Sequence, residues 1–447
     1  MKREAGVSKK ILIINYYWPP SGGPAVQRWL DFSNRLASDA YEVHVLTIEE
    51  SSATFVSVDR SLLDKIHPKI QIHFAKSNDL FGFYKKYIGK GRVPSNALAD
   101  EPHPTIAQKL ARFVRGNFIL PDPRKGWNSF AYKKATEIIE KYTINTVITA
   151  GPPHSTHLIG LKIKKSYHLN WIADFHDYWT DVFYLKKFYR TKLAHYFDAR
   201  MEKKVLQTAD AITTHCEYSK TLYSQKLNEA DVSKVSVLRM GYEDEYFLNY
   251  KPNDNQDKFV ITYTGTLPDY YDSNVFFIAL NDVLKKYPNL PVVIQMIGSI
   301  SDTVLSLIES LDLGAMTKFM GYVPHGQSIS YIKNSSLLLL VNPNLENDLG
   351  IVPGKIYEYL ATKNSILSIS SHGSENEYLL DQLHAGRNFE RNEKTEMISY
   401  LDTLIQIWLR EKNLIFDKSD SKIPYSRTEE YGKLRGLLDY KLIKNHI

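Results

Sequence analysis

A lysine and a glutamate three residues apart are the clearest candidates for chemistry in this chain of 447 residues. Lys355 and Glu358 follow an apolar run, residues 336–341, and a polar break that ends at Asp348. On a helix, residues three apart lie on one face. A lysine beside a helix N-terminus can neutralise phosphate, and a carboxylate one turn on can accept hydrogen bonds from two ribose hydroxyls. The same pattern is equally typical of an exposed ion pair on an amphipathic helix that binds nothing.

A glycine loop near the start of the chain is a second candidate for binding phosphate. The apolar run 11–15 leads into a loop with Gly22 and Gly23, and a helical pattern follows over 26–37. Glycines let backbone N–H groups approach a phosphate closely. The loop lacks the G-x-G-x-x-G pattern, which removes the main support for a nicotinamide or flavin cofactor. A tight turn without a ligand is the other interpretation.

Polar side chains also follow two later strand-like runs. His154 and His157 lie three apart after the first of them, but no third metal ligand lies nearby, so we expect a histidine that faces a substrate rather than zinc. The alternative is that His157 is a hydrogen-bonded residue at a helix start. Residues 174–181 combine carboxylates, His176 and aromatic rings, a group that can orient sugar hydroxyls or move a proton. Asp177 can equally serve as a helix cap.

The elements that must position these residues alternate between strand and helix. Such alternation predicts an α/β fold with two Rossmann-like halves, each a parallel sheet with helices on both faces. We expect an N-terminal domain over 1–250 and a C-terminal domain over 258–425, joined by a polar linker near 248–258, with 426–447 crossing back. The predicted strands are 11–15, 42–47, 70–74, 145–149, 171–175, 210–214 and 234–238, then 259–264, 292–297, 317–320, 336–341 and 365–369; the main predicted helices are 26–37, 129–142, 191–207 and 425–442.

Composition narrows the class of protein. A formal charge of +6 favours anionic partners such as nucleotides or acidic lipid surfaces, and we find no nucleic-acid motif. Cys216 is the single cysteine, so neither an intrachain disulfide nor a thiolate zinc cluster can form, which fits a reducing, cytoplasmic location. No run approaches the roughly 20 apolar residues that are needed to cross a bilayer.

A basic and aromatic segment, residues 76–126, interrupts the alternation. It suits acceptor capture or peripheral docking on the inner face of the cell membrane, and a solvated basic insertion is the other interpretation. Its cations include Lys85, Lys86, Lys90, Arg92, Lys109, Arg112 and Arg115.

Five stretches in order give the chain a family resemblance. It resembles the retaining GT-B glycosyltransferases of family 4, in particular those of bacterial surface-polysaccharide assembly such as lipopolysaccharide and capsule. The resemblance runs over nearly the whole chain and rests on YYWPPSGG (16–23), PDPRKGW (121–127), GPPHSTHL (151–158), ADFHDYW (173–179) and PGKIYEYLA (353–361).

The resemblance implies two Rossmann-like domains facing across a cleft, with a UDP- or GDP-linked sugar held mainly by the C-terminal one. It implies a glycan or lipid-linked acceptor and no cofactor beyond the nucleotide sugar. Its implied donor-binding residues are Gly22, Gly23, Thr266, Gly354, Lys355 and Glu358, and its implied catalytic residues are His157, Asp177 and Lys355.

Two positions depart from the family pattern. Many members carry a glutamate eight residues before the ribose-binding one, where this chain has Gly350; Glu346 or Asp348 compensates only if the loop bends inward. Members also often carry an arginine and a lysine after the first C-domain strand, whereas residues 265–272 here hold no cation. We expect the backbone N–H of Thr266 and the charge of Lys355 to serve instead.

Transfer of a sugar leaves negative charge on the departing diphosphate, which such a site must stabilise. The chain has no Asp-x-Asp pair, so we expect a metal-independent reaction. The resemblance implies retention of configuration, with same-face attack as the working hypothesis. The alternatives are a nucleotide-sugar-binding relative without turnover and a sugar-nucleotide epimerase or hydrolase on the same fold.

Overall fold

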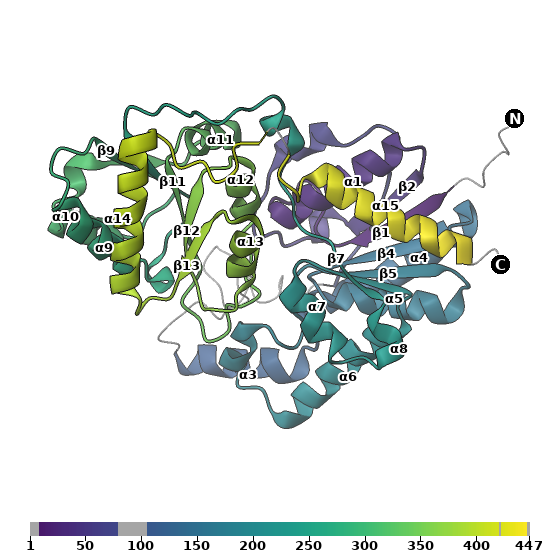
Figure 1. Ribbon diagram of the computed structural model, residues 1–447. Coiled ribbons are helices and arrows are strands. Elements are labelled where there is room, and N and C mark those ends of the chain that lie inside the picture. The colour runs from purple at the N-terminus through teal and green to yellow at the C-terminus, as the bar shows by residue number, and fades with distance from the viewer. Residues whose placement is uncertain (1–8, 79–104, 420–421, 445–447) are drawn as a thin grey trace, which may run out of the picture. The chain divides into compact units, whose positions relative to one another are not determined.

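The computed structural model describes residues 9–78, 105–419 and 422–444 (Figure 1). Contacts divide the chain into two units: an N-terminal unit of residues 1–240 and 430–447, and a C-terminal unit of residues 241–429. The polar stretch expected as a linker lies inside the C-terminal unit. Tyr250 donates its hydroxyl to the carbonyl of Lys333 at 3.0 Å, and the N–H of Gln256 donates to Lys412 at 2.9 Å, so this stretch packs on that unit.

The N-terminal unit is built on a seven-stranded parallel sheet in the order β3-β2-β1-β4-β5-β6-β7. The strand order therefore reverses between β1 and β4. The strands are β1 (Lys10–Asn15), β2 (Glu42–Ile48), β3 (Gln71–Ala75), β4 (Thr146–Gly151), β5 (Asn170–Phe175), β6 (Ala211–Thr214) and β7 (Val235–Val237). The helices are α1 (Pro24–Ser38), α3 (Ile106–Phe118), α4 (Asn128–Tyr142), α5 (Ser155–Ser166), α6 (Lys192–Thr208), α7 (Glu217–Ser224), α8 (Glu229–Val232) and α15 (Arg427–Lys444).

Alternation along the buried strands gives this sheet a core on each face. Ile11 and Ile13 of β1 pack with α1 and α15, whereas Leu12 and Ile14 pack with α4, α5 and α6 (Figure 1). Both faces are covered by helices, which explains why the strands read as continuous apolar runs.

The C-terminal unit repeats this design with six parallel strands in the order β10-β9-β8-β11-β12-β13. Its strand order reverses between β8 and β11. The strands are β8 (Phe259–Thr264), β9 (Val292–Ile297), β10 (Thr317–Gly321), β11 (Leu337–Val341), β12 (Ser365–Ile369) and β13 (Gly386–Phe389). The helices are α9 (Asn274–Leu284), α10 (Asp302–Ser310), α11 (His325–Lys333), α12 (Lys355–Ala361), α13 (Glu375–Leu383) and α14 (Lys394–Glu411).

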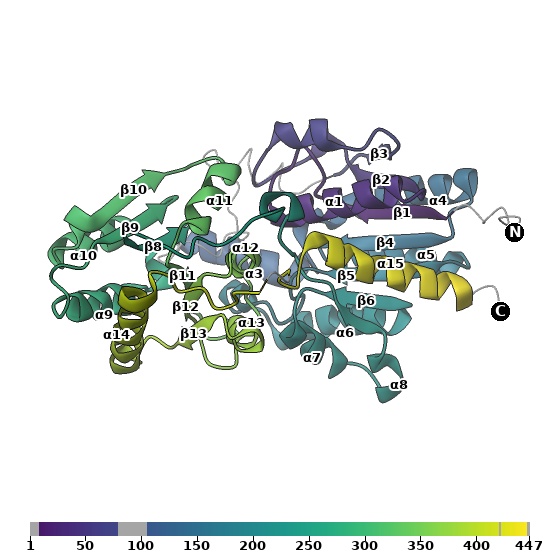
Figure 2. The same cartoon turned by 45° about the horizontal axis from the view of Figure 1, so that its top comes forward.

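The helices of the C-terminal unit also lie on both faces of its sheet, as Figure 2 shows. α9, α10 and α14 share one core with Phe259, Ile261 and Leu339. On the other face, α12 contacts the end of β8, because the hydroxyl of Tyr359 accepts the N–H of Thr264 at 3.0 Å. The expected α/β class with two Rossmann-like units is confirmed.

Each strand predicted from the sequence is present, with ends that agree or differ by one or two residues. The sequence did not predict strand β13 or helix α3, which lies in the basic segment 76–126, and it assigned no residue ranges to α5, α7, α8, α9, α10, α11, α13 and α14. The helix that carries Lys355 and Glu358 begins at Lys355, after a turn in which the N–H groups of Ile356 and Tyr357 donate to the carbonyls of Pro353 and Gly354. In the part of the chain that the structure describes, no helix combines the length and apolar character that a bilayer span requires.

Candidate functional site

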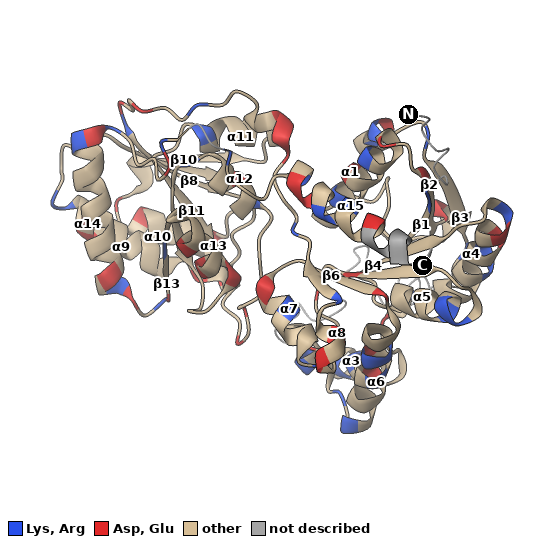
Figure 3. Ribbon diagram, turned by 45° about the vertical axis from the view of Figure 1, so that its right-hand side comes forward, with Lys and Arg blue, Asp and Glu red and all other residues tan. Residues whose placement is uncertain are grey.

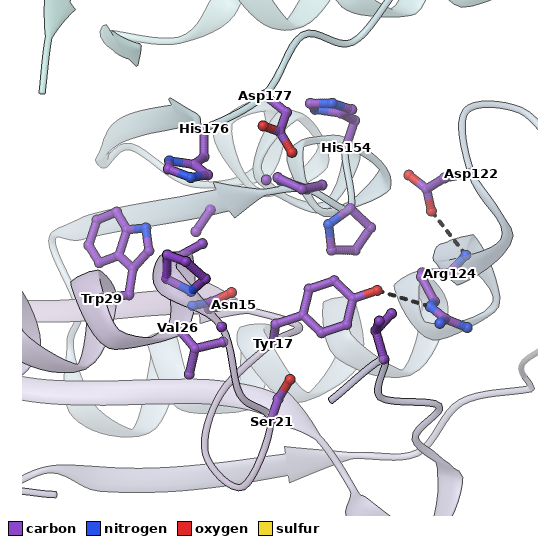
Figure 4. Close-up of a pocket in the computed structure, with 18 of the residues that line it drawn as sticks. Asn15, Tyr17, Ser21, Val26, Trp29, Asp122, Arg124, His154, His176 and Asp177 are labelled. Carbon is purple, nitrogen blue, oxygen red and sulfur yellow. Dashed lines mark hydrogen bonds between the residues drawn. The ribbon is translucent and has the colours of Figure 1, made fainter. Parts of the chain in front are cut away.

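The N-terminal unit has a cavity of about 340 Å³ at the carboxyl ends of β1, β4 and β5 (Figure 4). In open parallel sheets, ligands bind where the strand order reverses, and that point here lies between β1 and β4. The cavity is lined by Asn15, Tyr17, Ser21 to Val26, Trp29, Val56, Ser57, Arg115, Asp122 to Arg124, Ala150 to His154, His176, Asp177 and Tyr184. We call it the N-terminal pocket.

The glycine loop forms one wall of this pocket. The N–H of Gly22 donates to the carbonyl of Ser57 at 3.0 Å, which fixes the loop against the segment after β2. A Cβ at Gly22 would lie 3.0 Å from the Ser57 hydroxyl oxygen. Gly23 has a φ of 117°, a conformation that favours glycine, and α1 begins directly after it. Both predicted glycines therefore line the pocket on a fixed turn.

Asp122 and Arg124 tie three loops together at the opposite wall. The carboxylate of Asp122 accepts the N–H of Ser155 at 2.7 Å and its hydroxyl at 2.8 Å, which caps α5. The guanidinium of Arg124 donates to the Thr54 hydroxyl at 2.6 Å and to the Tyr17 hydroxyl at 3.4 Å. Figure 4 shows Tyr17 between these groups and the pocket. Asp122 and Arg124 belong to the stretch PDPRKGW (121–127), whose sequence alone did not indicate this role.

Asp177 and His176 reach the pocket from the loop after β5 (Figure 4). The Asp177 side chain is exposed, while its backbone carbonyl accepts the Tyr223 hydroxyl at 3.3 Å. Burial lowers the pKa of His176 to about 4, so its imidazole is neutral near pH 7. An exposed carboxylate and a neutral imidazole therefore lie side by side in the lining of the pocket.

Asp174 serves a structural role instead. Its carboxylate accepts Arg28 at 3.0 and 3.2 Å, the indole N–H of Trp29 at 2.9 Å and the Thr213 hydroxyl at 2.6 Å. Arg28 and Asp174 are 0% and 1% exposed. This buried ion pair joins α1 to β5 and so fixes Trp29 at the pocket.

His157 lies beneath the pocket rather than in its wall. It is completely buried, its Nδ1 lies 2.9 Å from the Thr149 hydroxyl, and its ring stacks on Phe175 at 4.3 Å. A Cβ at Gly151 would lie 2.5 Å from Nε2, so the imidazole supports the backbone of the wall. Burial lowers the pKa of His157 well below its ordinary value. The histidines that line the pocket are His154 and His176.

The C-terminal unit places Lys355 where its own strand order reverses. The ammonium donates to the carbonyl of Thr264, the last residue of β8, at 2.6 Å and lies 3.8 Å from the centre of the Tyr263 ring. A Cβ at Gly265 would lie 3.5 Å from this nitrogen. Burial lowers the pKa of Lys355 to about 7. Gly354 is the N-cap residue of α12, directly before it.

Glu358 lies one turn along α12. Its carboxylate accepts a hydrogen bond from Nε2 of His325, at the start of α11, at 2.7 Å, and this hydrogen bond raises the pKa of His325. Thr266 is exposed in the loop after β8, and its carbonyl accepts the Tyr263 hydroxyl at 2.7 Å. Thr266, Gly354, Lys355 and Glu358 therefore belong to one edge of the C-terminal sheet.

Sequence reasoning missed a second cation at this edge. Arg391, two residues beyond β13, donates to the carbonyl of Asn342 at 2.7 Å and to that of Tyr271 at 2.9 Å. It thereby bridges the loops after β11 and β8. The only available signal was its position after a strand, and β13 itself is too short and polar to be recognised.

Asp348, in the loop before Gly350, does not take the place of the missing glutamate. Asp348 is 1% exposed and accepts the N–H of Ser371 at 3.1 Å. Glu346 is exposed. Asp348 therefore holds the loop after β12 rather than facing a ligand.

No model of a known protein family matches the chain, and no curated protein sequence matches it either. Solved structures, however, are similar over nearly its whole length. The sucrose-phosphate synthase from Thermosynechococcus elongatus has 12% identity and a TM-score of 0.61, and the match covers 98% of this chain and 100% of that one. The lipopolysaccharide outer core galactosyltransferase WaaB has 12% identity and a TM-score of 0.59, with 97% and 99% covered.

A protein from Listeria monocytogenes, assigned as a UDP-N-acetylglucosamine 2-epimerase, has 11% identity and a TM-score of 0.56, with 98% of each chain covered. At these identities the likeness establishes the fold alone. The two parallel sheets with their helices match the two Rossmann-like domains of these GT-B neighbours, which include glycosyltransferases and the protein assigned as an epimerase.

Proposed function

We propose that this protein is a glycosyltransferase that moves a sugar from a nucleotide-diphosphate donor to a glycan or lipid-linked acceptor in cell-surface polysaccharide synthesis. One observation carries the proposal. Lys355 and Arg391 bring two cations to the edge between β8 and β11, and Glu358 lies one helical turn from Lys355. A nucleoside diphosphate offers that edge two phosphates for the cations and ribose hydroxyls for the carboxylate.

The cations also suit the chemistry of transfer. Negative charge develops on the departing diphosphate, and cations held in place before the reaction stabilise it at no cost of reorganisation. Arg391 supplies the charge that the loop 265–272 lacks. Thr266 and Gly354 offer backbone contacts beside Lys355. We propose that the donor is UDP- or GDP-linked, that the reaction needs no metal, and that same-face attack retains the anomeric configuration.

The N-terminal pocket is our proposed acceptor site. Aromatic rings suit the faces of sugars, and Tyr17, Trp29 and Tyr184 line the cavity. Asp177 faces it as the carboxylate that orients an acceptor hydroxyl, and Gly22 and Gly23 allow close approach of the donor. We assign His157 a positioning role, because it supports Gly151 from below. The protein would act in the cytoplasm.

An assay of nucleoside diphosphate release tests this function. The purified protein is incubated with UDP- and GDP-sugars, with and without a lipid-linked glycan extract. We expect release that requires both substrates and that falls at least about a hundredfold in Lys355→Met, as removal of one charge-stabilising donor does. Asp381→Asn, an exposed substitution on α13, should keep the wild-type rate.

The same assay separates the other candidate functions. The fold of the epimerase from Listeria monocytogenes supports a sugar-nucleotide epimerase as the second candidate. Isomerised or hydrolysed donor without acceptor would establish an epimerase or hydrolase and overturn transfer. Nucleotide binding without any turnover would establish an inactive nucleotide-sugar-binding relative.

A further inference from the structure

α3 turns its apolar side outward. Ile106, Leu110 and Phe118 are 86%, 63% and 71% exposed, and Phe113 and Val114 are exposed beside them. These positions recur every three or four residues, so they form one stripe along the helix. A helix on a globular protein normally buries such a stripe, whereas the stripe of α3 is exposed.

The buried side of α3 carries charge instead. Arg112 and Arg115 are 4% and 7% exposed. Gly116 of α3 is buried as well and faces Phe188. The guanidinium of Arg115 donates to the carbonyl of Ile119 at 2.8 Å. A Cβ at Gly116 would lie 2.5 Å from the carbonyl oxygen of Phe188, so only glycine permits this close approach. The outward direction of the apolar stripe is therefore fixed by packing.

The neighbouring helix α6 is inverted in the same way. Leu193, Tyr196 and Phe197 are 65%, 56% and 51% exposed, whereas Asp198 and Glu202 are both 1% exposed. The Asp198 carboxylate accepts the indole N–H of Trp179 at 2.8 Å and pairs with Arg190 at 2.6 Å. The Glu202 carboxylate pairs with Lys226 at 2.7 Å. Both carboxylates are therefore buried and paired inside the N-terminal unit.

α3 and α6 contact each other, and Figure 3 shows them adjacent. The segment between them adds direct bonds: the N–H of Thr191 donates to the Asn117 side chain at 2.8 Å, and Asn117 donates to the carbonyl of Tyr189 at 3.1 Å. Their outward residues therefore belong to one surface. We call it the α3–α6 surface: Ile106, Leu110, Phe113, Val114, Phe118, Tyr189, Leu193, Tyr196 and Phe197.

The exposed charges of the elements that carry this surface have one sign. Within α3, α6 and the 3-10 helix Phe183–Phe188, all of which the structure describes, the only acidic residues are the buried Asp198 and Glu202. The exposed charged side chains there include Lys109, Lys192, Arg200 and Lys203. An apolar stripe flanked by cations is complementary to a layer with anionic headgroups above acyl chains.

We propose that the α3–α6 surface docks the protein on an anionic lipid bilayer, with its apolar side chains in the interface and its lysines against the headgroups. A second copy of the chain suits the surface less well, because two cationic surfaces face to face repel each other. This inference does not depend on glycosyl transfer, since lipid binding requires neither donor nor acceptor. It also places the contact on α6, outside the basic segment named from the sequence.

Co-sedimentation with lipid vesicles tests the inference. Vesicles of phosphatidylcholine are compared with vesicles that contain about 30% phosphatidylglycerol, since anionic lipid attracts each lysine near the surface. Two variants are used, Leu110→Ser/Phe118→Ser/Leu193→Ser and Lys109→Glu/Lys192→Glu/Arg200→Glu. A matched control, Phe319→Ser/Leu409→Ser, removes exposed apolar groups from the C-terminal unit.

We expect the wild type and the control to bind the anionic vesicles, and each variant to bind at least about tenfold more weakly. Added salt should weaken binding, and neutral vesicles should bind little. Equal binding by folded variants and wild type, or no binding by the wild type, would overturn the inference. A wild-type dimer in solution that both variants dissociate would assign the surface to a second copy instead.

Discussion

The charge of Lys355 depends on what occupies the edge of the C-terminal sheet. Burial lowers its pKa to about 7, so about nine tenths of the ammonium is deprotonated at pH 8. A diphosphate would restore the charge by raising the pKa again. We predict that nucleotide binding at pH 8 takes up close to one proton and that uptake is smaller at pH 6.

Calorimetric titration in buffers of different ionisation enthalpy measures this uptake. Lys355→Arg is the control, because a guanidinium stays protonated throughout this range and binding then takes up no proton at that position. If the wild type and Lys355→Arg take up the same number of protons, Lys355 does not face the phosphates.

If Glu358 binds the ribose as we propose, His325 competes with that ribose, because it already bonds the same carboxylate. Its hydrogen bond to that carboxylate raises the pKa of His325, so the charged pair is complete in acid and is lost as pH rises through the raised pKa. Nearby Glu243 favours the charged imidazole further. We predict that the ratio of the nucleotide Kd of the wild type to that of His325→Ala is roughly two- to fivefold higher at pH 6 than at pH 8. This factor corresponds to the free energy of a partly exposed ion pair. A ratio that stays constant with pH would remove His325 from the donor site.

At the scale of elements, the buried pair of Arg28 and Asp174 holds α1 against β5. We predict that Asp174→Ala lowers the free energy of unfolding by about 3–5 kcal/mol, because it leaves Arg28 charged and unpaired in the core. The apolar double variant Arg28→Met/Asp174→Leu should lose less. Glu137→Ala, which breaks an exposed pair with Lys134, should change stability by less than about 0.5 kcal/mol. Urea denaturation checks all three, and a similar loss in Asp174→Ala and Glu137→Ala would refute the role of the pair.

Elements with strong patterns could be predicted from the sequence, and those with weak patterns could not. The run Leu337–Val341 is apolar throughout and is buried on both faces, so its pattern leaves one interpretation. β13 has four residues, of which Arg387 is exposed, and no periodicity can develop over that length. The sequence of α3 indicated a basic insertion because charged residues usually lie on the surface. In the structure Arg112 and Arg115 point inward instead.

At the scale of the whole molecule, one rule explains why the candidate sites could be located at all. Both sheets reverse their strand order after the first strand of the unit, and both groups of predicted residues lie at that reversal. The loops carrying Gly22, Asp177 and Lys355 could be placed at the carboxyl ends of strands from the sequence, because each loop follows a strand-like run. The burial of His157 and the bridge made by Arg391 depend on side-chain packing that the order of strands does not specify.

Thermal stabilisation by UDP and GDP tests the central claim, that the edge with Lys355 and Glu358 binds the nucleotide. A ligand that binds only the folded state raises the Tm by mass action. We expect one of the two nucleotides to raise the Tm of the wild type and of Asp177→Asn, and to have no effect on Lys355→Ala or Glu358→Ala. No shift with either nucleotide in a folded protein, or a shift that survives in both Lys355→Ala and Glu358→Ala, would contradict the claim.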